Sequence, residues 1–184
     1  MSKLKLATVW LGGCSGCHMS FLDLDEWLFE LAKFADVVFS PVADAKTFPE
    51  GVDVCLVEGA IANEDNLELV QQVRARSRLV VAFGDCAITG NVTALRNMNG
   101  EPSDLLQRIY IDEADIATDG VPKEEGIVPK LLPKVLPLQQ VIEVDAYLPG
   151  CPPSATRIQT MLEALRDDGS VQLSGELIRF GQGA

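Results

Sequence analysis

The sequence has no long apolar run and little positive charge, and both shortages exclude whole classes of function. No run of about 20 apolar residues occurs, so we expect no transmembrane helix. Lys and Arg total 15 against 27 Asp and Glu, and the net charge of -12 repels nucleic-acid phosphates and anionic lipid. We therefore expect neither nucleic-acid binding nor direct insertion into a membrane.

Targeting signals and paired cysteines are also missing. The first residues, Met1 to Leu6, contain neither a long apolar signal region nor a twin-arginine pair, which predicts a cytoplasmic protein. The 5 cysteines are an odd number in a chain of 184 residues, a size that does not need disulfide bonds to fold. Free thiols in a reducing compartment favour metal or redox chemistry.

Strand-like and helix-like patterns alternate along the chain. Apolar or β-branched segments predict strands, and apolar residues at helical spacing predict helices between them. This alternation predicts an α/β fold, a flavodoxin-like doubly wound open parallel sheet with helices on both faces, formed by a single domain over 1–184. The predicted strands cover 5–10, 36–39, 52–57, 79–83 and 141–148, and the main helices cover about 20–34, 63–73 and 154–166.

The segment 112–138 does not fit this alternation. It is rich in proline and carries mixed charge, and it is long for a loop without secondary structure in a compact domain. We interpret it as a candidate docking segment for a partner, and a plain surface excursion explains it equally well.

Four of the cysteines directly follow predicted strands. The carboxyl ends of parallel strands meet at one edge of a sheet, so Cys14, Cys17, Cys86 and Cys151 should gather at that edge. Cys55 lies inside a predicted strand, where a thiol packs as a small apolar side chain, and we exclude it from the site.

Four thiolates can hold structural zinc or an iron-sulfur cluster. Closed zinc sites usually combine two local cysteine pairs. Here there is one Cys-x-x-Cys pair and two isolated cysteines. Cys86 follows Cys17 by 69 residues, and Cys151 follows Cys86 by 65 residues. This spacing favours a cluster held by the whole fold. Zinc, a redox-active dithiol and unligated thiols are the alternatives.

The cysteine-containing motifs resemble those of a known family. In content and order they are similar to motifs in the small subunits of nickel-iron hydrogenases, over about Leu4 to Leu165. The related quinone-reductase subunit of respiratory complex I typically has adjacent cysteines in its first motif, whereas two residues separate them here. The motifs are Cys14-Ser15-Gly16-Cys17, Glu58-Gly59, Gly84-Asp85-Cys86 and Gly150-Cys151-Pro152-Pro153.

The resemblance implies a specific role. Without a cysteine-rich C-terminal region or a twin-arginine signal, the chain most resembles the small subunit of cytoplasmic, bidirectional NAD(P)-linked hydrogenases. The family implies one proximal 4Fe-4S cluster ligated by Cys14, Cys17, Cys86 and Cys151. The nickel-iron centre would lie in a hydrogenase large subunit, and electrons would pass to diaphorase subunits during reversible H2 oxidation. The alternatives are a complex-I-like quinone-module subunit and a non-redox zinc scaffold.

Two further residues and one further cofactor are candidates. His18 could hydrogen-bond a cluster sulfur or assist proton movement, although a solvent-facing histidine at a helix start is the favoured interpretation. Glu58 could relay protons at the large-subunit interface or simply accept bonds from nearby backbone N-H groups. A flavodoxin-like crevice can also accept flavin mononucleotide (FMN), for which we find no separate sequence signature.

Overall fold

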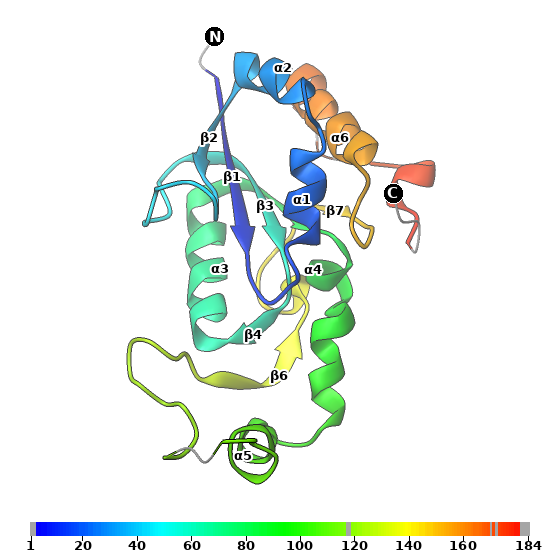
Figure 1. The fold of residues 1–184 in the computed structure, drawn as a ribbon. Helices are drawn as coiled ribbons and strands as arrows, with labels where there is room; N and C mark the ends of the chain where they lie inside the picture. Colours follow the sequence, from blue (N-terminus) through cyan, green and yellow to red (C-terminus); the bar gives the residue numbers. More distant parts are fainter. Residues whose placement is uncertain (1–2, 117–118, 170, 172, 181–184) are drawn as a thin grey trace.

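A computed structural model describes residues 3–116, 119–169, 171 and 173–180. Its centre is a 5-stranded parallel sheet in the order β2-β1-β3-β5-β7 (Figure 1). Numbered by the strands of this sheet alone, this is the 2-1-3-4-5 order of flavodoxin, which confirms the predicted fold. The strands are β1 (Leu4–Trp10), β2 (Ala35–Phe39), β3 (Val52–Glu58), β5 (Ser77–Phe83) and β7 (Ala146–Leu148).

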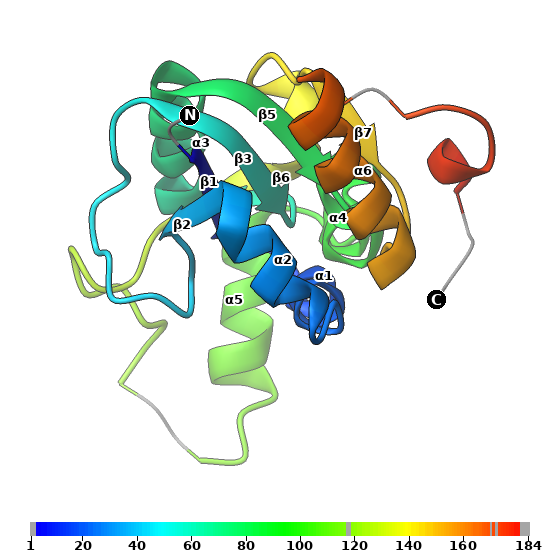
Figure 2. The same cartoon turned by 90° about the horizontal axis from the view of Figure 1, so that it is seen from above.

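Helices cover both faces of this sheet, as Figure 2 shows from above. One hydrophobic core lies between the sheet and α1, α2 and α6, and another lies between the sheet and α3 and α4. The central strands are therefore buried on both faces, which explains their nearly continuous apolar sequence. The helices are α1 (Gly16–Leu22), α2 (Trp27–Phe34), α3 (Glu64–Arg76), α4 (Asp85–Thr89), α5 (Pro102–Gln107) and α6 (Ala155–Asp168).

Shorter elements complete the fold. The segments η1 (Asn91–Met98), η3 (Leu138–Gln140) and η4 (Gly175–Ile178) are 3-10 helices, and η2 (Arg108–Asp112) is a π-helix. β4 (Ile61–Asn63) pairs antiparallel with β6 (Leu131–Leu136), so the segment 112–138 contains a strand that its sequence did not predict. Within the described residues, no helix is both long and apolar enough to cross a membrane.

Two predicted element boundaries are wrong. The predicted helix over 20–34 is divided into α1 and α2 by a turn in which Asp25 has a φ of 49°. The predicted strand over 141–148 is reduced to β7, because Val141 and Ile142 donate to Leu138 O in the turn after η3 and the Asp145 side chain replaces a backbone partner. Its carboxylate accepts hydrogen bonds from Val80 N-H at 2.7 Å and from Arg74 Nη1 at 2.6 Å.

The start of α3 allows a test of local stability. Asn63 has an extended backbone, and its side chain accepts a hydrogen bond from Asn66 N-H at 2.8 Å. Replacing Asn63 with Ala should lower the free energy of unfolding by about 1 kcal/mol, because an N-H group at the helix start loses its partner. Urea denaturation would measure this change. Asn63→Ser should retain most of the stability, and equal losses in both variants would contradict a capping role.

Candidate metal centre

The four predicted ligands all lie at the carboxyl edge of the sheet. Cys14 lies between β1 and α1, Cys17 lies in the first turn of α1, Cys86 lies in the first turn of α4 after β5, and Cys151 lies between β7 and α6. Cys17 and Cys86 are buried, whereas Cys14 and Cys151 are exposed. Cys55 lies within β3 and is completely buried in the core beneath α3 and α4, as expected for a packing residue.

The four thiols interact electrostatically. Burial raises the pKa of the Cys17 thiol, and negative charge on Glu58, Cys86, Cys14 and Cys151 raises it further. The pKa of Cys86 is also raised, first by burial and then by Cys151, Cys14 and Glu58. Four thiolates would repel one another in this setting, and a shared cationic group would remove that repulsion. The donor set therefore fits either zinc or a 4Fe-4S cluster.

The cysteine side chains are too widely spaced to bind a single metal ion. Within residues 3–116, 119–169, 171 and 173–180, no three His, Cys, Asp or Glu side chains are grouped closely enough to hold a metal ion. Electrostatic effects act over longer distances than metal-ligand bonds. The cysteines can therefore raise one another's pKa without being close enough to share one ion. The thiols are therefore neighbours at one edge of the sheet without being grouped as the ligands of a single ion.

Hydrogen bonds join the Cys86 loop to the Cys151 loop. Gly84 N-H donates to Leu148 O, and Asp85 N-H donates to Gly150 O, both at 2.9 Å. In return, Gly150 N-H donates to the Asp85 carboxylate at 2.7 Å. These three hydrogen bonds hold the loop that carries Cys86 and the loop that carries Cys151 at a fixed spacing. Asp85 belongs to the Gly84-Asp85-Cys86 motif, and its structural role becomes apparent only in the fold.

Hydrogen-bond donors also reach the sulfur atoms. Gly16 N-H donates to Cys14 Sγ, and Asn91 Nδ2-H donates to Cys151 Sγ, each at 3.4 Å. A hydrogen bond from the Thr93 side chain lowers the pKa of Cys86 against the effect of burial. Asn91 and Thr93 were missed in the sequence, where a Gly-Asn pair at a helix start is the available signal for an unusual backbone at Asn91.

His18 is buried, so the favoured interpretation of a solvent-facing histidine is wrong. His18 is 9% exposed to solvent, and Glu58 at the end of β3 is 1% exposed. The Glu58 carboxylate accepts a hydrogen bond from His18 N-H at 3.0 Å and also contacts His18 Nδ1. Glu58 therefore ties the turn that carries Cys17 to the end of β3. His18 Nε2 is buried and has no hydrogen-bond partner among the described residues.

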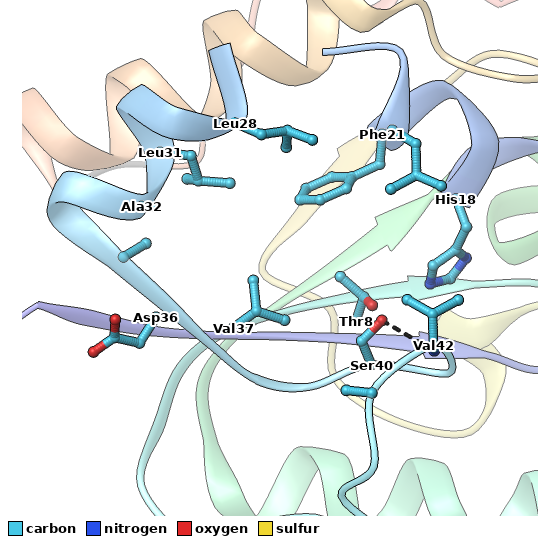
Figure 3. A pocket seen from close by; sticks show the side chains of 13 residues that line it. Thr8, His18, Phe21, Leu28, Leu31, Ala32, Asp36, Val37, Ser40 and Val42 are labelled. Carbon is cyan, nitrogen blue, oxygen red and sulfur yellow. Dashed lines mark hydrogen bonds between the residues drawn. The ribbon is translucent and has the colours of Figure 1, made fainter. Parts of the chain in front are cut away.

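A cavity of about 430 Å³ lies beside His18, between the sheet edge and helices α1 and α2 (Figure 3). Apolar side chains form most of its wall, among them Phe21, Leu28, Leu31 and Val37. None of the residues that line it is Lys or Arg, the side chains that most often bind phosphate groups.

The position where flavodoxins bind FMN is closed by backbone contacts. In this strand order that position lies between the ends of β1 and β3. Here Gly12 and Ala60 form an antiparallel bridge, with Gly12 N-H donating to Ala60 O at 2.9 Å and Ala60 N-H donating to Gly12 O at 2.8 Å. A Cβ at Gly59 would come within 2.9 Å of the Gly12 carbonyl carbon, so the two loops are in close contact.

Comparisons with known proteins agree with this fold. The family described as NADH ubiquinone oxidoreductase, 20 Kd subunit, matches residues 14–165. One chain in the crystal structure of an NAD+-reducing NiFe-hydrogenase in the H2-reduced state is similar with a TM-score of 0.90 and 37% identity, covering 97% of this chain and 99% of that chain.

Individual relatives extend the agreement to sequence. The F420-non-reducing hydrogenase of Methanothermobacter marburgensis contains a subunit that is 38% identical over 179 residues, covering 93% of this chain and 56% of the relative. The chain thus spans little more than half the length of that relative. The delta subunit of the NAD-reducing hydrogenase HoxS of Cupriavidus necator is 33% identical over 184 residues, covering 97% of this chain and 86% of the relative. The chain therefore belongs to the NADH-ubiquinone oxidoreductase 20 kDa subunit family and, within it, to the small subunits of nickel-iron hydrogenases.

Proposed function

We propose that this chain is an electron-transfer subunit that holds one 4Fe-4S cluster through Cys14, Cys17, Cys86 and Cys151. It would carry electrons between the nickel-iron centre of a hydrogenase large subunit and a diaphorase module, during reversible H2 oxidation coupled to NAD(P). The observation that supports this most strongly is the position of four cysteines directly after the ends of three parallel strands, at one edge of the sheet. They occur in a fold with a TM-score of 0.90 to a chain of an NAD+-reducing NiFe-hydrogenase.

The residues around the cysteines suit this role. A bound 4Fe-4S cluster supplies one-electron transfer. Cys17 and Cys86 would hold its buried side, where the surrounding core excludes water. Cys14 and Cys151 are exposed and would hold the side on which an electron enters or leaves. No proton needs to be exchanged by these four residues while they are metal-bound.

Exposed apolar residues near Cys14 in the sequence support docking of the large subunit. Trp10, Met19 and Leu22 are 46%, 56% and 45% exposed, on the segment that runs through the first cysteine motif. Large apolar side chains that remain exposed are typical of protein-protein contacts where they gather on one surface. We propose that the large subunit covers this surface.

The segment 112–138 is proposed to contact a diaphorase subunit. Ile116 and Ile127 are strongly exposed, and β6 within the segment is anchored to β4. Arg96 from η1 adds support by donating hydrogen bonds to Leu132 O at 3.0 Å and to Ala62 O at 3.2 Å. The anchored strand would present the exposed residues of the segment at a fixed place.

We further propose that Glu58 and His18 support the Cys17 turn. The hydrogen bond from His18 N-H to the Glu58 carboxylate carries this proposal. A proton-relay role is less supported, because both side chains are buried within the chain. FMN is not included in the proposed function, since backbone contacts close the flavodoxin position and no Lys or Arg lines the cavity beside His18.

Anaerobic co-purification with metal analysis would test the proposed function. The complex should contain nickel, and this subunit should contain iron and acid-labile sulfide in the ratio of a 4Fe-4S cluster. The purified complex should also reduce NAD(P) with H2. Stoichiometric zinc without iron would contradict the cluster and support a zinc scaffold. Quinone reduction without H2-dependent NAD(P) reduction would support the complex-I-like alternative.

A further inference from the structure

Cys151 lies on an exposed loop and has a side-chain hydrogen-bond donor against its sulfur. Asn91 Nδ2 is 3.4 Å from Cys151 Sγ, although the two residues are 60 positions apart in the sequence. The Cys151 backbone is held separately, through the hydrogen bonds of Asp85 to Gly150. The Asn91 contact therefore acts on the sulfur atom itself.

The backbone at Asn91 explains why an asparagine suits this position. Asn91 has a φ of 37°, in the left-handed region that Asn adopts more readily than most residues. Asn91 directly follows Gly90, which ends α4 with a φ of 83°. The N-H of Asn91 donates a hydrogen bond to Thr89 Oγ1 at 3.2 Å. The reversal between α4 and η1 thus places a short amide side chain beside Cys151.

The same helix reaches a second sulfur. Thr93, two residues further along η1, donates a hydrogen bond to Gly12 O at 2.9 Å, and its side chain also lowers the pKa of Cys86. Its single hydroxyl proton has two acceptors within reach, whereas the Asn91 amide has two N-H donors. Asn91 is therefore the better candidate for a constant donor to sulfur. In Figure 1, η1 is the green helix that runs down from α4.

We propose that Asn91 is a positioning residue that orients Cys151 and raises the reduction potential of the cluster through its N-H···S hydrogen bond. The proposal rests on the proposed function, namely that Cys151 ligates a 4Fe-4S cluster. Reduction adds one electron, and the sulfur ligands gain part of its negative charge. A hydrogen-bond donor therefore stabilises the reduced state more than the oxidised state. No proton is transferred, because the amide keeps both hydrogens.

Asn91→Gly in the purified complex separates the hydrogen bond from the backbone, because glycine adopts positive φ without strain. We expect an unchanged iron content and a cluster about tenfold harder to reduce, a shift of about 59 mV to lower potential for a one-electron couple. Redox titration followed by electron paramagnetic resonance would measure this. Electron-nuclear double resonance should also lose the coupling of one exchangeable proton.

A charge-matched pair of variants provides the control. Asn91→Asp removes the donor and adds a negative charge beside the sulfur, so its potential should fall further than that of Asn91→Gly. Asn99→Asp makes the same charge change at the end of η1, where the Asn99 side chain bonds Leu95 O at 3.3 Å, and it should leave the potential almost unchanged.

The outcomes distinguish this inference from the proposed function. A wild-type potential in Asn91→Gly with full iron content would overturn the tuning role. Loss of iron from Asn91→Gly, with the cluster intact in the unaltered complex, would show that Asn91 only retains the ligand and would also overturn it. Absence of the cluster signal from the unaltered complex would instead contradict the proposed function.

Discussion

Replacing Cys86 with Ala should abolish the intact 4Fe-4S cluster and H2-dependent NAD(P) reduction by the complex, whereas replacing Cys55 with Ala should preserve both. Both thiols are buried, and burial raises the pKa of both. Of these two, Cys86 alone also has a pKa raised by other cysteines, Cys151 and Cys14, which places it among the proposed ligands. Cys55 faces the core beneath α3 and α4.

Iron and sulfide analysis, with the visible absorbance of the anaerobic protein, would measure the difference between these variants. Cys55→Ala should cost on the order of 1 kcal/mol of stability through lost packing, without loss of iron. A full and spectroscopically unchanged cluster in Cys86→Ala would refute the ligand assignment. Equal loss of iron from both variants would show that the effect is general destabilisation of the fold.

Gly84→Ala should also deplete the cluster strongly, although position 84 carries no ligand. Gly84 has a φ of 83° and a ψ of 165°, a combination that is nearly restricted to glycine. A Cβ at this position would overlap Cys17 Sγ and would lie 3.4 Å from Gly150 O. The added methyl group would therefore displace Cys17, a proposed ligand. The alanine backbone would also be strained by about 1–3 kcal/mol in this conformation.

Gly169→Ala is the matched control. Gly169 ends α6 with a φ of 66° and a ψ of 13°, and a Cβ there would meet no atom within 4 Å. This variant should lose about 1 kcal/mol of stability from left-handed strain and keep its iron. Circular dichroism would establish that both variants are folded, and iron analysis would compare them. Full iron occupancy in folded Gly84→Ala would contradict a tight approach between position 84 and the Cys17 sulfur.

Several sequence predictions depended on patterns that extend over only a few residues. The uniformly apolar β5, for example, indicated burial on both faces, and the structure confirms this. The division of the predicted helix over 20–34 was harder to foresee. Asp23, Asp25 and Glu26 are all compatible with a helix, and the turn depends on the left-handed backbone at Asp25.

Local sequence patterns were sufficient to establish the flavodoxin-like order of elements and the positions of Cys14, Cys17, Cys86 and Cys151 after strands. Parallel strands share one carboxyl edge, so these patterns alone bring the thiols to that edge. The side chains that surround the thiols were determined by tertiary packing. The bond from Asn91 to Cys151 joins residues 60 positions apart, and that from His18 to Glu58 joins residues 40 apart. Such contacts depend on how α4, η1 and the strand ends pack in three dimensions, and no local periodicity in the sequence encodes that packing.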